Sequence, residues 1–218
     1  MKREKRIKNL KMLDYKKLGF RAGLEIHQQI SGKKLFCNCP VKTNKTERPD
    51  VIIKRKLRAV AGAKGKKDIA ALYEEQKDKT FIYEYYHDTN CLIDIDEEPI
   101  NEINQEALEA VLQLSLLLKA KTVPKIKVMR KIVIDGSNIS GFQRTSLIAT
   151  NGKVKTSKGI IKIPTIYLEE EAAKKISSNE KEVTYRLDRL GVPLIEVSTS
   201  ADIKDPEHKG DHNGTESE

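Results

Sequence analysis

A short stretch near the N-terminus combines a carboxylate with an imidazole. The segment Phe20 to Ile30 alternates apolar and polar residues, which predicts a β-strand. Side chains alternate across a strand, so Glu25 and His27 share one face and Leu24 and Ile26 the other. A carboxylate beside an imidazole can ligate a metal ion or shuttle a proton. Taken alone, the pattern favours the simpler interpretation of a half-exposed strand with polar residues turned to solvent.

Three consecutive carboxylates, Glu169 to Glu171, lie within the segment Tyr167 to Ala173. Neighbouring negative charges repel one another unless a cation or a basic partner relieves the repulsion. One interpretation is the first turn of a helix, where acidic residues are favourable. The other is a divalent-metal site, since hard oxygen ligands suit Mg²⁺.

A single carboxylate, Glu196, interrupts an otherwise apolar run in the predicted strand Leu194 to Ser198. A carboxylate in such a strand is costly unless it is paired or bound to a metal. Arg186 or Arg189 could be its partner, and a salt bridge is therefore the alternative to metal binding.

The loop over residues 135–145 has the composition of an anion site. Gly136 and Gly141 permit backbone conformations that aim N–H groups at an anion, and Arg144 adds a forked donor. The loop lacks the Gly-Lys-Ser or Gly-Lys-Thr sequence of a P-loop. An ordinary tight surface loop is the alternative.

The three cysteines are too few, and odd in number, for a disulfide framework. No secretory signal is evident and no apolar run is long enough to span a bilayer, so we expect a reducing compartment, the cytoplasm. Cys37 and Cys39 could give two thiolates to zinc, but a structural zinc site needs four ligands. Cys91 alone cannot complete the set, so free thiols are favoured over zinc held with the help of His or a partner.

Charge is distributed in blocks along the chain, whose formal net charge is +9. Residues 1–17 carry +6 and residues 42–67 carry +8, whereas residues 94–109 carry −7. Two basic blocks are typical of a protein that binds a phosphate-rich partner through counterion release. A generally Lys-rich surface explains the same composition.

The apolar periodicity predicts an α+β domain with one long helix. Apolar residues recur at spacings of three and four from Glu102 to Lys119, with Asn101 or Asn104 as the N-cap. A shorter helix is predicted over 68–76. Further strands are predicted at 51–58, 81–86, 91–95, 126–129, 132–134, 146–150, 160–163 and 194–198.

Several of these motifs occur together in the order seen in the GatB/GatE family. They are residues 23–27, 34–40, 168–173 and 190–196. The run 136–145 resembles the archaeal GatE branch more closely than the bacterial GatB branch. Over residues 14–206, the chain resembles the kinase subunits of tRNA-dependent amidotransferases.

The resemblance implies a cradle-shaped α+β domain with a mixed, largely antiparallel sheet and few helices. It implies a carbon–nitrogen ligase that uses ATP and Mg²⁺ to phosphorylate the glutamyl side chain of misacylated Glu-tRNA(Gln). Ammonia from an asparaginase-like partner subunit, GatD, then replaces the phosphate to give Gln-tRNA(Gln). The implied catalytic residues are Glu25, His27, Glu169 and Glu196; His27, Glu169 and Glu196 would bind the metal, and Gly141, Gln143 and Arg144 the nucleotide.

The expected organisation has three parts. Residues 1–17 form a basic lead-in, residues 18–206 form part of the cradle, and residues 207–218 lack large apolar side chains, which predicts disorder. Members of the family are far longer, so we expect a fragment that is inactive alone. A non-catalytic basic RNA-binding domain is the alternative function from another class.

Overall fold

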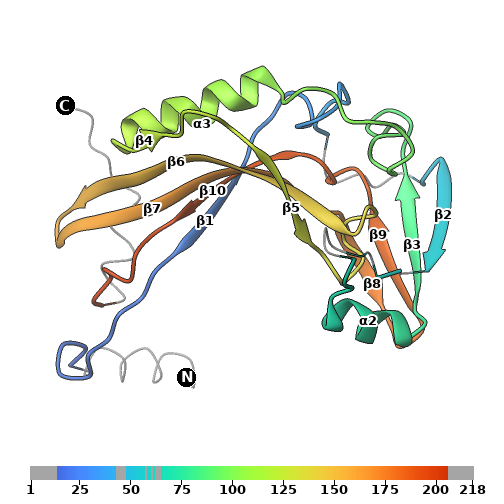
Figure 1. Ribbon diagram of the computed structural model, residues 1–218, viewed down its shortest axis with the longest axis horizontal. Helices are drawn as coiled ribbons and strands as arrows, with labels where there is room; N and C mark the ends of the chain where they lie inside the picture. Colours follow the sequence, from blue (N-terminus) through green and yellow to red (C-terminus); the bar gives the residue numbers. More distant parts are fainter. Residues whose placement is uncertain (1–13, 43–47, 57, 60, 62–64, 206–218) are drawn as a thin grey trace.

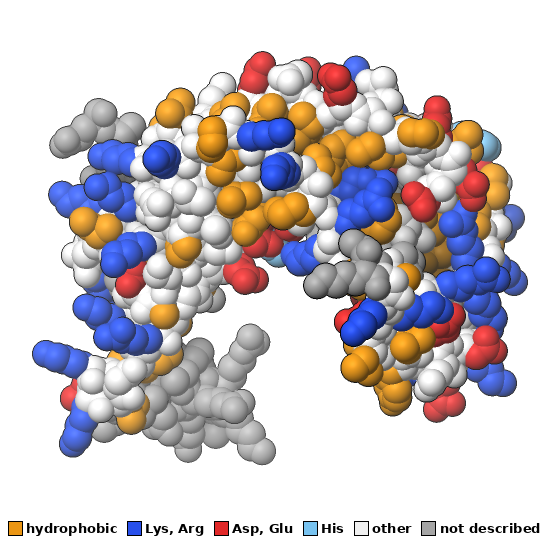
Figure 2. All heavy atoms as spheres, viewed as in Figure 1, with side chains coloured by type: hydrophobic (Ala, Val, Ile, Leu, Met, Phe, Trp, Pro, Cys, Tyr) orange, Lys and Arg blue, Asp and Glu red, His pale blue; other side chains and the backbone are white. Residues whose placement is uncertain are grey.

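Two β-sheets and two helices make up the part of the chain that the structure describes. This computed structural model describes residues 14–42, 48–56, 58–59, 61 and 65–205. The sheets form the two limbs of an arch, with a hollow on its concave side (Figure 1, Figure 2). The predicted lead-in and tail lie largely or wholly outside the described residues.

The first sheet has the strand order β1-β10-β7-β6-β4, and β5 also pairs with β6. Every pairing in it is antiparallel. Its longest strands, β6 and β7, form one hairpin that runs the length of the sheet (Figure 1). The strands are β1 Glu25–Gln29, β4 Lys121–Thr122, β5 Val128–Ile132, β6 Phe142–Thr156, β7 Gly159–Glu170 and β10 Pro193–Ser198.

The second sheet has the order β2-β3-β9-β8, and its β3–β9 pair is parallel. Its strands are β2 Val51–Lys56, β3 Thr80–Tyr85, β8 Lys174–Ser178 and β9 Glu182–Arg186. Phe81, Tyr83, Val183 and Tyr185 pack together as its core. The short helix predicted over 68–76 is α2, Ile69–Gln76, which begins where the Asp68 carboxylate accepts two backbone N–H groups.

Helix α3, Gln105–Leu117, covers one face of the first sheet (Figure 1). Its N-cap is Asn104, whose side chain accepts from the N–H of Ala107. Ala107, Val111 and Ser115 recur every four residues and are buried, so one stripe of the helix packs on the sheet. The sheet side of this core includes Ile148, Ile166, Leu168, Ile195 and Val197. The opposite face of the same strands is therefore left for polar residues.

The predicted α+β class with largely antiparallel pairing is confirmed, but the strand predicted over 91–95 is wrong. These residues form turns. The cause is Asp94, whose Oδ2 accepts from the backbone N–H of Cys91 at 3.2 Å and from Asn90 Nδ2 at 2.9 Å. Side-chain bonds to nearby backbone compete with a strand ladder, and here they override the β-propensity of the segment.

Two other local predictions need correction. Glu169 and Glu170 end strand β7 and are not the first turn of a helix. The strand predicted from Phe20 is shorter, since β1 covers only Glu25–Gln29. Among the described residues, no helix is long and apolar enough to cross a membrane.

Breaking the buried ion pair of Lys34 tests how the turn at 91–95 is held. Lys34 Nζ lies 2.8 Å from Asp94 Oδ2, and the two side chains are 1% and 4% exposed. We expect Lys34→Met to lower the free energy of unfolding by about 3–5 kcal/mol, because it leaves a buried carboxylate unpaired. Urea denaturation measures this change.

The adjacent exposed Lys33 provides the matched control. Lys33→Met should change the free energy of unfolding by less than about 0.5 kcal/mol. Equal effects of the two substitutions would contradict a structural role for the buried pair.

Candidate functional site

His27 and Glu196 meet on the face of the first sheet that α3 does not cover. Strand β1 pairs with β10 so that His27 lies directly opposite Glu196. Residues opposite each other in an antiparallel pair point to the same face. His27 Nε2 is 3.1 Å from Glu196 Oε2, and the side chains are 50% and 13% exposed. The imidazole is therefore half-exposed to solvent, and the carboxylate beside it is largely buried.

Glu169 lies on the same face, one strand further along. Strand β10 places Glu196 opposite Tyr167 of β7, and Glu169 is two residues beyond Tyr167. Glu169 is thus a diagonal neighbour of Glu196, and diagonal neighbours have Cα atoms about 7–8 Å apart. Acidic side chains gather at the roof of the hollow in Figure 2. The two carboxylates can face one cation from adjacent strands.

The Glu169 carboxylate is 4% exposed and held from several sides. Thr145 Oγ1 donates to its Oε1 at 2.6 Å, and Gln143 Nε2 donates to its Oε2 at 3.3 Å. Lys131 Nζ lies 3.5 Å from Oε1. A hydroxyl, an amide and a lysine thus surround this largely buried carboxylate. Sequence reasoning missed Lys131 and Thr145; their only signal is their cross-strand position.

Glu25 is not brought to Glu169. It pairs with Ser198, whereas Glu169 pairs with Leu194, four residues away along β10. That offset is about 13 Å along the strand. Glu25 shares the face of His27 but lies on the side away from Glu169, so the four implied catalytic residues share one face without all lying side by side.

The guanidinium of Arg144 pairs with Glu170, so its hydrogen-bond donors are not free to bind an anion in the hollow. Its Nη1 lies 3.1 Å from both carboxylate oxygens of Glu170, and both side chains are largely buried. Its guanidinium also lies over the rings of Phe36 and Phe142. Burial raises the pKa of the Glu170 carboxyl, while the charge of Arg144 opposes that rise. The prediction that Arg144 binds nucleotide is therefore not supported by its contacts.

The two arginines considered as partners of Glu196 make contacts elsewhere. Arg186 pairs with Asp188 at 2.9 Å. Arg189 donates to the backbone carbonyls of Ala172 and Ala173. The carboxylate of Glu196 contacts His27 and, at 3.4 Å, Ser198 Oγ.

The donor set of the hollow suits a hard divalent cation. Carboxylate oxygens are the ligands that Mg²⁺ prefers, and one or two of them with water complete its shell. Glu169 and Glu196 supply the carboxylates, and His27 could add a nitrogen. The same chemistry is implied by the family resemblance.

The sequence pattern described as the GatB/GatE catalytic domain matches residues 20–212. This chain belongs to the GatB/GatE family. The resemblance drawn from the ordered motifs is thereby confirmed. The matched range includes β1, β7 and β10, the three strands that carry His27, Glu169 and Glu196.

Three archaeal relatives, each named as the E subunit of a glutamyl-tRNA(Gln) amidotransferase, illustrate the similarity. The Pyrococcus horikoshii protein is 53% identical over 194 residues, covering 89% of this chain and 30% of its own length. The Thermococcus gammatolerans protein is 52% identical over 194 residues, covering 89% and 31%. The Methanocaldococcus jannaschii protein is 49% identical over 195 residues, again covering 89% and 31%. The chain thus spans about three tenths of the length of these GatB/GatE relatives.

A second set of metal-ligating groups lies outside the carboxylate face of this GatB/GatE domain. The sulfurs of Cys37, Cys39 and Cys91 and a carboxylate oxygen of Asp94 all lie within 4.8 Å of one another. Asp94 supplies the fourth ligand that sequence reasoning did not find; the signal for it was the Cys91-x-x-Asp94 spacing. Three thiolates and a carboxylate around one point are a set that can hold zinc.

Metal analysis tests this cysteine cluster. We expect about one zinc per chain after dialysis, because four ligands suffice for a closed tetrahedral site. Cys91→Ser should lower that content, whereas His87→Ala, outside the cluster, should not. Three freely reactive thiols in a zinc-free protein would contradict the expectation.

Proposed function

We propose that this chain forms the cation-binding part of a subunit that converts Glu-tRNA(Gln) to Gln-tRNA(Gln). The proposal is supported by membership of the GatB/GatE family and by the names of the relatives. The single observation that carries it is the placement of His27, Glu196 and Glu169 on the same open face of one sheet. In the relatives, the matched region covers about three tenths of a longer subunit.

The proposed reaction has two steps. The γ-carboxylate oxygen of the glutamyl group attacks the γ-phosphorus of ATP, which gives an acyl phosphate and ADP. Ammonia from a GatD partner subunit then attacks the acyl carbon, and inorganic phosphate leaves as the amide forms. A bound Mg²⁺ would neutralise charge on the phosphoryl oxygens.

The chain's own residues would position the reactants. Glu169 and Glu196 would hold the cation on the concave face. Lys131, 3.5 Å from Glu169, would limit the negative charge that the approaching phosphates meet. His27 is hydrogen-bonded to Glu196, which orients its ring. The ring is half-exposed and remains accessible. Positioning of this kind accounts for many orders of magnitude in phosphoryl transfer.

Conservative substitution in a subunit of full length tests these roles. We expect Glu196→Gln to lower the rate of Gln-tRNA(Gln) formation about a hundredfold or more, because one charged ligand of the cation is lost. Glu109→Gln, on the exposed side of α3, is the matched control and should leave the rate unchanged. A steady-state assay with ATP, Mg²⁺ and the GatD partner measures both.

A substitution at His27 separates a functional role from a structural one. Because its side chain is 50% exposed, His27→Ala should reduce activity without lowering the melting temperature. A large loss of thermal stability with unchanged turnover of the folded fraction would contradict the proposal.

Basic residues on β2 favour a second role in binding RNA. Lys54, Arg55 and Lys56 lie on this strand and Arg58 follows it, and Lys and Arg side chains gather on this limb in Figure 2. We infer that this limb contacts tRNA phosphates. The remaining members of the two basic blocks lie partly outside the described residues.

A salt titration of tRNA binding tests the electrostatic contribution. With about four phosphate contacts, affinity should fall about a hundredfold between 50 and 200 mM salt. The chain alone should discriminate poorly among tRNAs and form no Gln-tRNA(Gln). Salt-independent binding, or efficient amidation by this chain alone, would contradict these expectations.

A further inference from the structure

A groove of about 670 Å³ lies where the C-terminal end of α3 meets the β6–β7 hairpin. Figure 1 shows this end of the helix above the hairpin, at the end of the arch away from the second sheet. The lining residues are Leu114, Leu117, Leu118, Lys119, Lys153, Val154, Lys155 and Ile160. The groove thus combines aliphatic side chains with lysines, and the described residues that line it include no acid.

Backbone hydrogen bonds fix the two walls of the groove against each other. The N–H of Lys153 donates to the carbonyl of Leu118 at 2.8 Å, which ties β6 to the end of α3. Gly152 lets the backbones meet this closely, because a Cβ there would lie 3.1 Å from the Cβ of Ala120. The N–H of Ala120 donates to the carbonyl of Ser115 at 2.9 Å and closes the helix. The groove is therefore formed before any partner arrives.

The aliphatic part of the groove is only partly covered by the protein itself. Leu114, Leu118 and Val154 are half-buried and form its floor. Leu117 and Ile160, at its edges, are 78% and 59% exposed. Removing apolar surface of this kind from water is favourable in proportion to the area buried. An apolar partner would therefore be stabilised here.

Three exposed lysines, Lys119, Lys153 and Lys155, surround this aliphatic floor. Among the residues that the structure describes, none of their ammonium groups has an ion-pair or hydrogen-bond partner. Lys119 has φ +53°, in the left-handed region, at the position after the helix where glycine is the usual residue. It therefore carries its charge to the groove at a conformational cost that glycine would avoid. A partner that complements this charge brings carboxylates.

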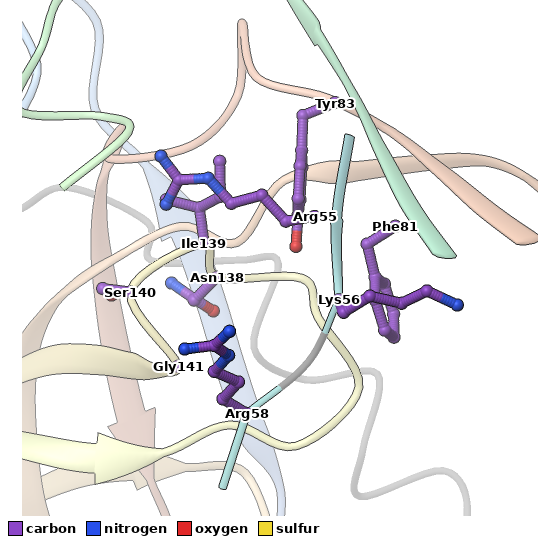
Figure 3. Close-up of a pocket in the computed structure, with 9 residues that line it drawn as sticks. All are labelled: Arg55, Lys56, Arg58, Phe81, Tyr83, Asn138, Ile139, Ser140 and Gly141. Carbon is purple, nitrogen blue, oxygen red and sulfur yellow. The ribbon is translucent and has the colours of Figure 1, made fainter. Parts of the chain in front are cut away.

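Composition and shape favour a protein segment over a nucleic acid or a membrane. Nucleic-acid bases stack on aromatic rings, such as those of Phe81 and Tyr83 in the walls of the pocket in Figure 3, on the other limb. Among the described residues that line the groove, none is aromatic. A lipid surface receives the protruding apolar face of a helix, whereas this surface is concave. A hydrophobic groove is the usual receptor for an amphipathic helix.

We propose that the groove docks an acidic amphipathic helix of a partner protein. Such a helix carries apolar side chains at spacings of three and four along one stripe, and these would lie on the aliphatic floor. Carboxylates beside the stripe would meet Lys119, Lys153 and Lys155. Helix α3 covers the face of the sheet opposite Glu169 and Glu196, so docking leaves the carboxylate face open.

Equilibrium binding of the 218-residue chain to a synthetic peptide tests the proposal. The probe is a helical peptide of about 18 residues with leucines at i, i+3, i+4 and i+7 and glutamates beside them. Leu117→Ala should weaken its binding about tenfold, because an apolar contact is lost. Leu116→Ala is the matched control: Leu116 is 71% exposed on the same helix but does not line the groove, so affinity should be unchanged.

A pair of lysine substitutions tests the charge. Lys153→Gln combined with Lys155→Gln should weaken binding about tenfold and reduce its dependence on salt. Lys125→Gln combined with Lys127→Gln removes the same charge at the same spacing outside the groove and should have little effect. Equal effects of the two pairs would overturn the proposal. It would also be overturned if the peptide did not bind, or bound no better than a scrambled peptide of the same composition.

Other occupants of the groove give different results. Dimers of the parent chain in sedimentation that Leu117→Ala abolishes would assign the groove to a second copy. Binding to phosphatidylserine vesicles that the same variant abolishes would assign it to a membrane. Either result would overturn docking of a partner helix. Thermal melting should be unchanged in Leu117→Ala, because the side chain is mostly exposed.

Discussion

The antiparallel register of β10 between β1 and β7 is the constraint on which the candidate site depends. It sets His27 opposite Glu196 and makes Glu169 their diagonal neighbour. A slip by one residue would turn Glu196 beneath α3 and bring Ile195 into the hollow. The register is fixed at the end of β1, where Thr199 Oγ1 accepts from Leu24 N–H at 2.8 Å. Gly23 permits this approach, since a Cβ there would lie 2.9 Å from the carbonyl of Thr199.

Alternation along β7 explains how three adjacent carboxylates coexist. Glu169 points to the concave face, where Thr145 and Lys131 hold it. Glu170 points the other way and pairs with Arg144. Glu171, past the strand end, accepts from Gln29 Nε2 at 2.8 Å. The repulsion evident in the sequence is thus relieved by separation onto different sides, and only one of the three is left for a cation.

Sequence reasoning recovered the features that depend on local pattern. The helix α3 and the face shared by Glu25 and His27 follow from spacing, whereas the sequence left the cap of α3 open between Asn101 and Asn104. Contacts between residues far apart in the sequence could not be predicted from local pattern. Asp94 joins the cysteines, and Arg144 pairs with Glu170, because the fold brings together residues far apart in sequence. The identity of the family came from the order of several motifs, none of which was specific alone.

The central claim is that Glu169 and Glu196 bind one divalent cation together on the concave face. A crystal of this chain soaked in Mn²⁺, which substitutes for Mg²⁺ at oxygen sites, tests it through the anomalous scattering of the metal. The account predicts one Mn²⁺ about 2 Å from a carboxylate oxygen of each residue, with His27 beside it. A metal bound only at the cysteine cluster, or no peak between Glu169 and Glu196 at saturating Mn²⁺, would contradict it.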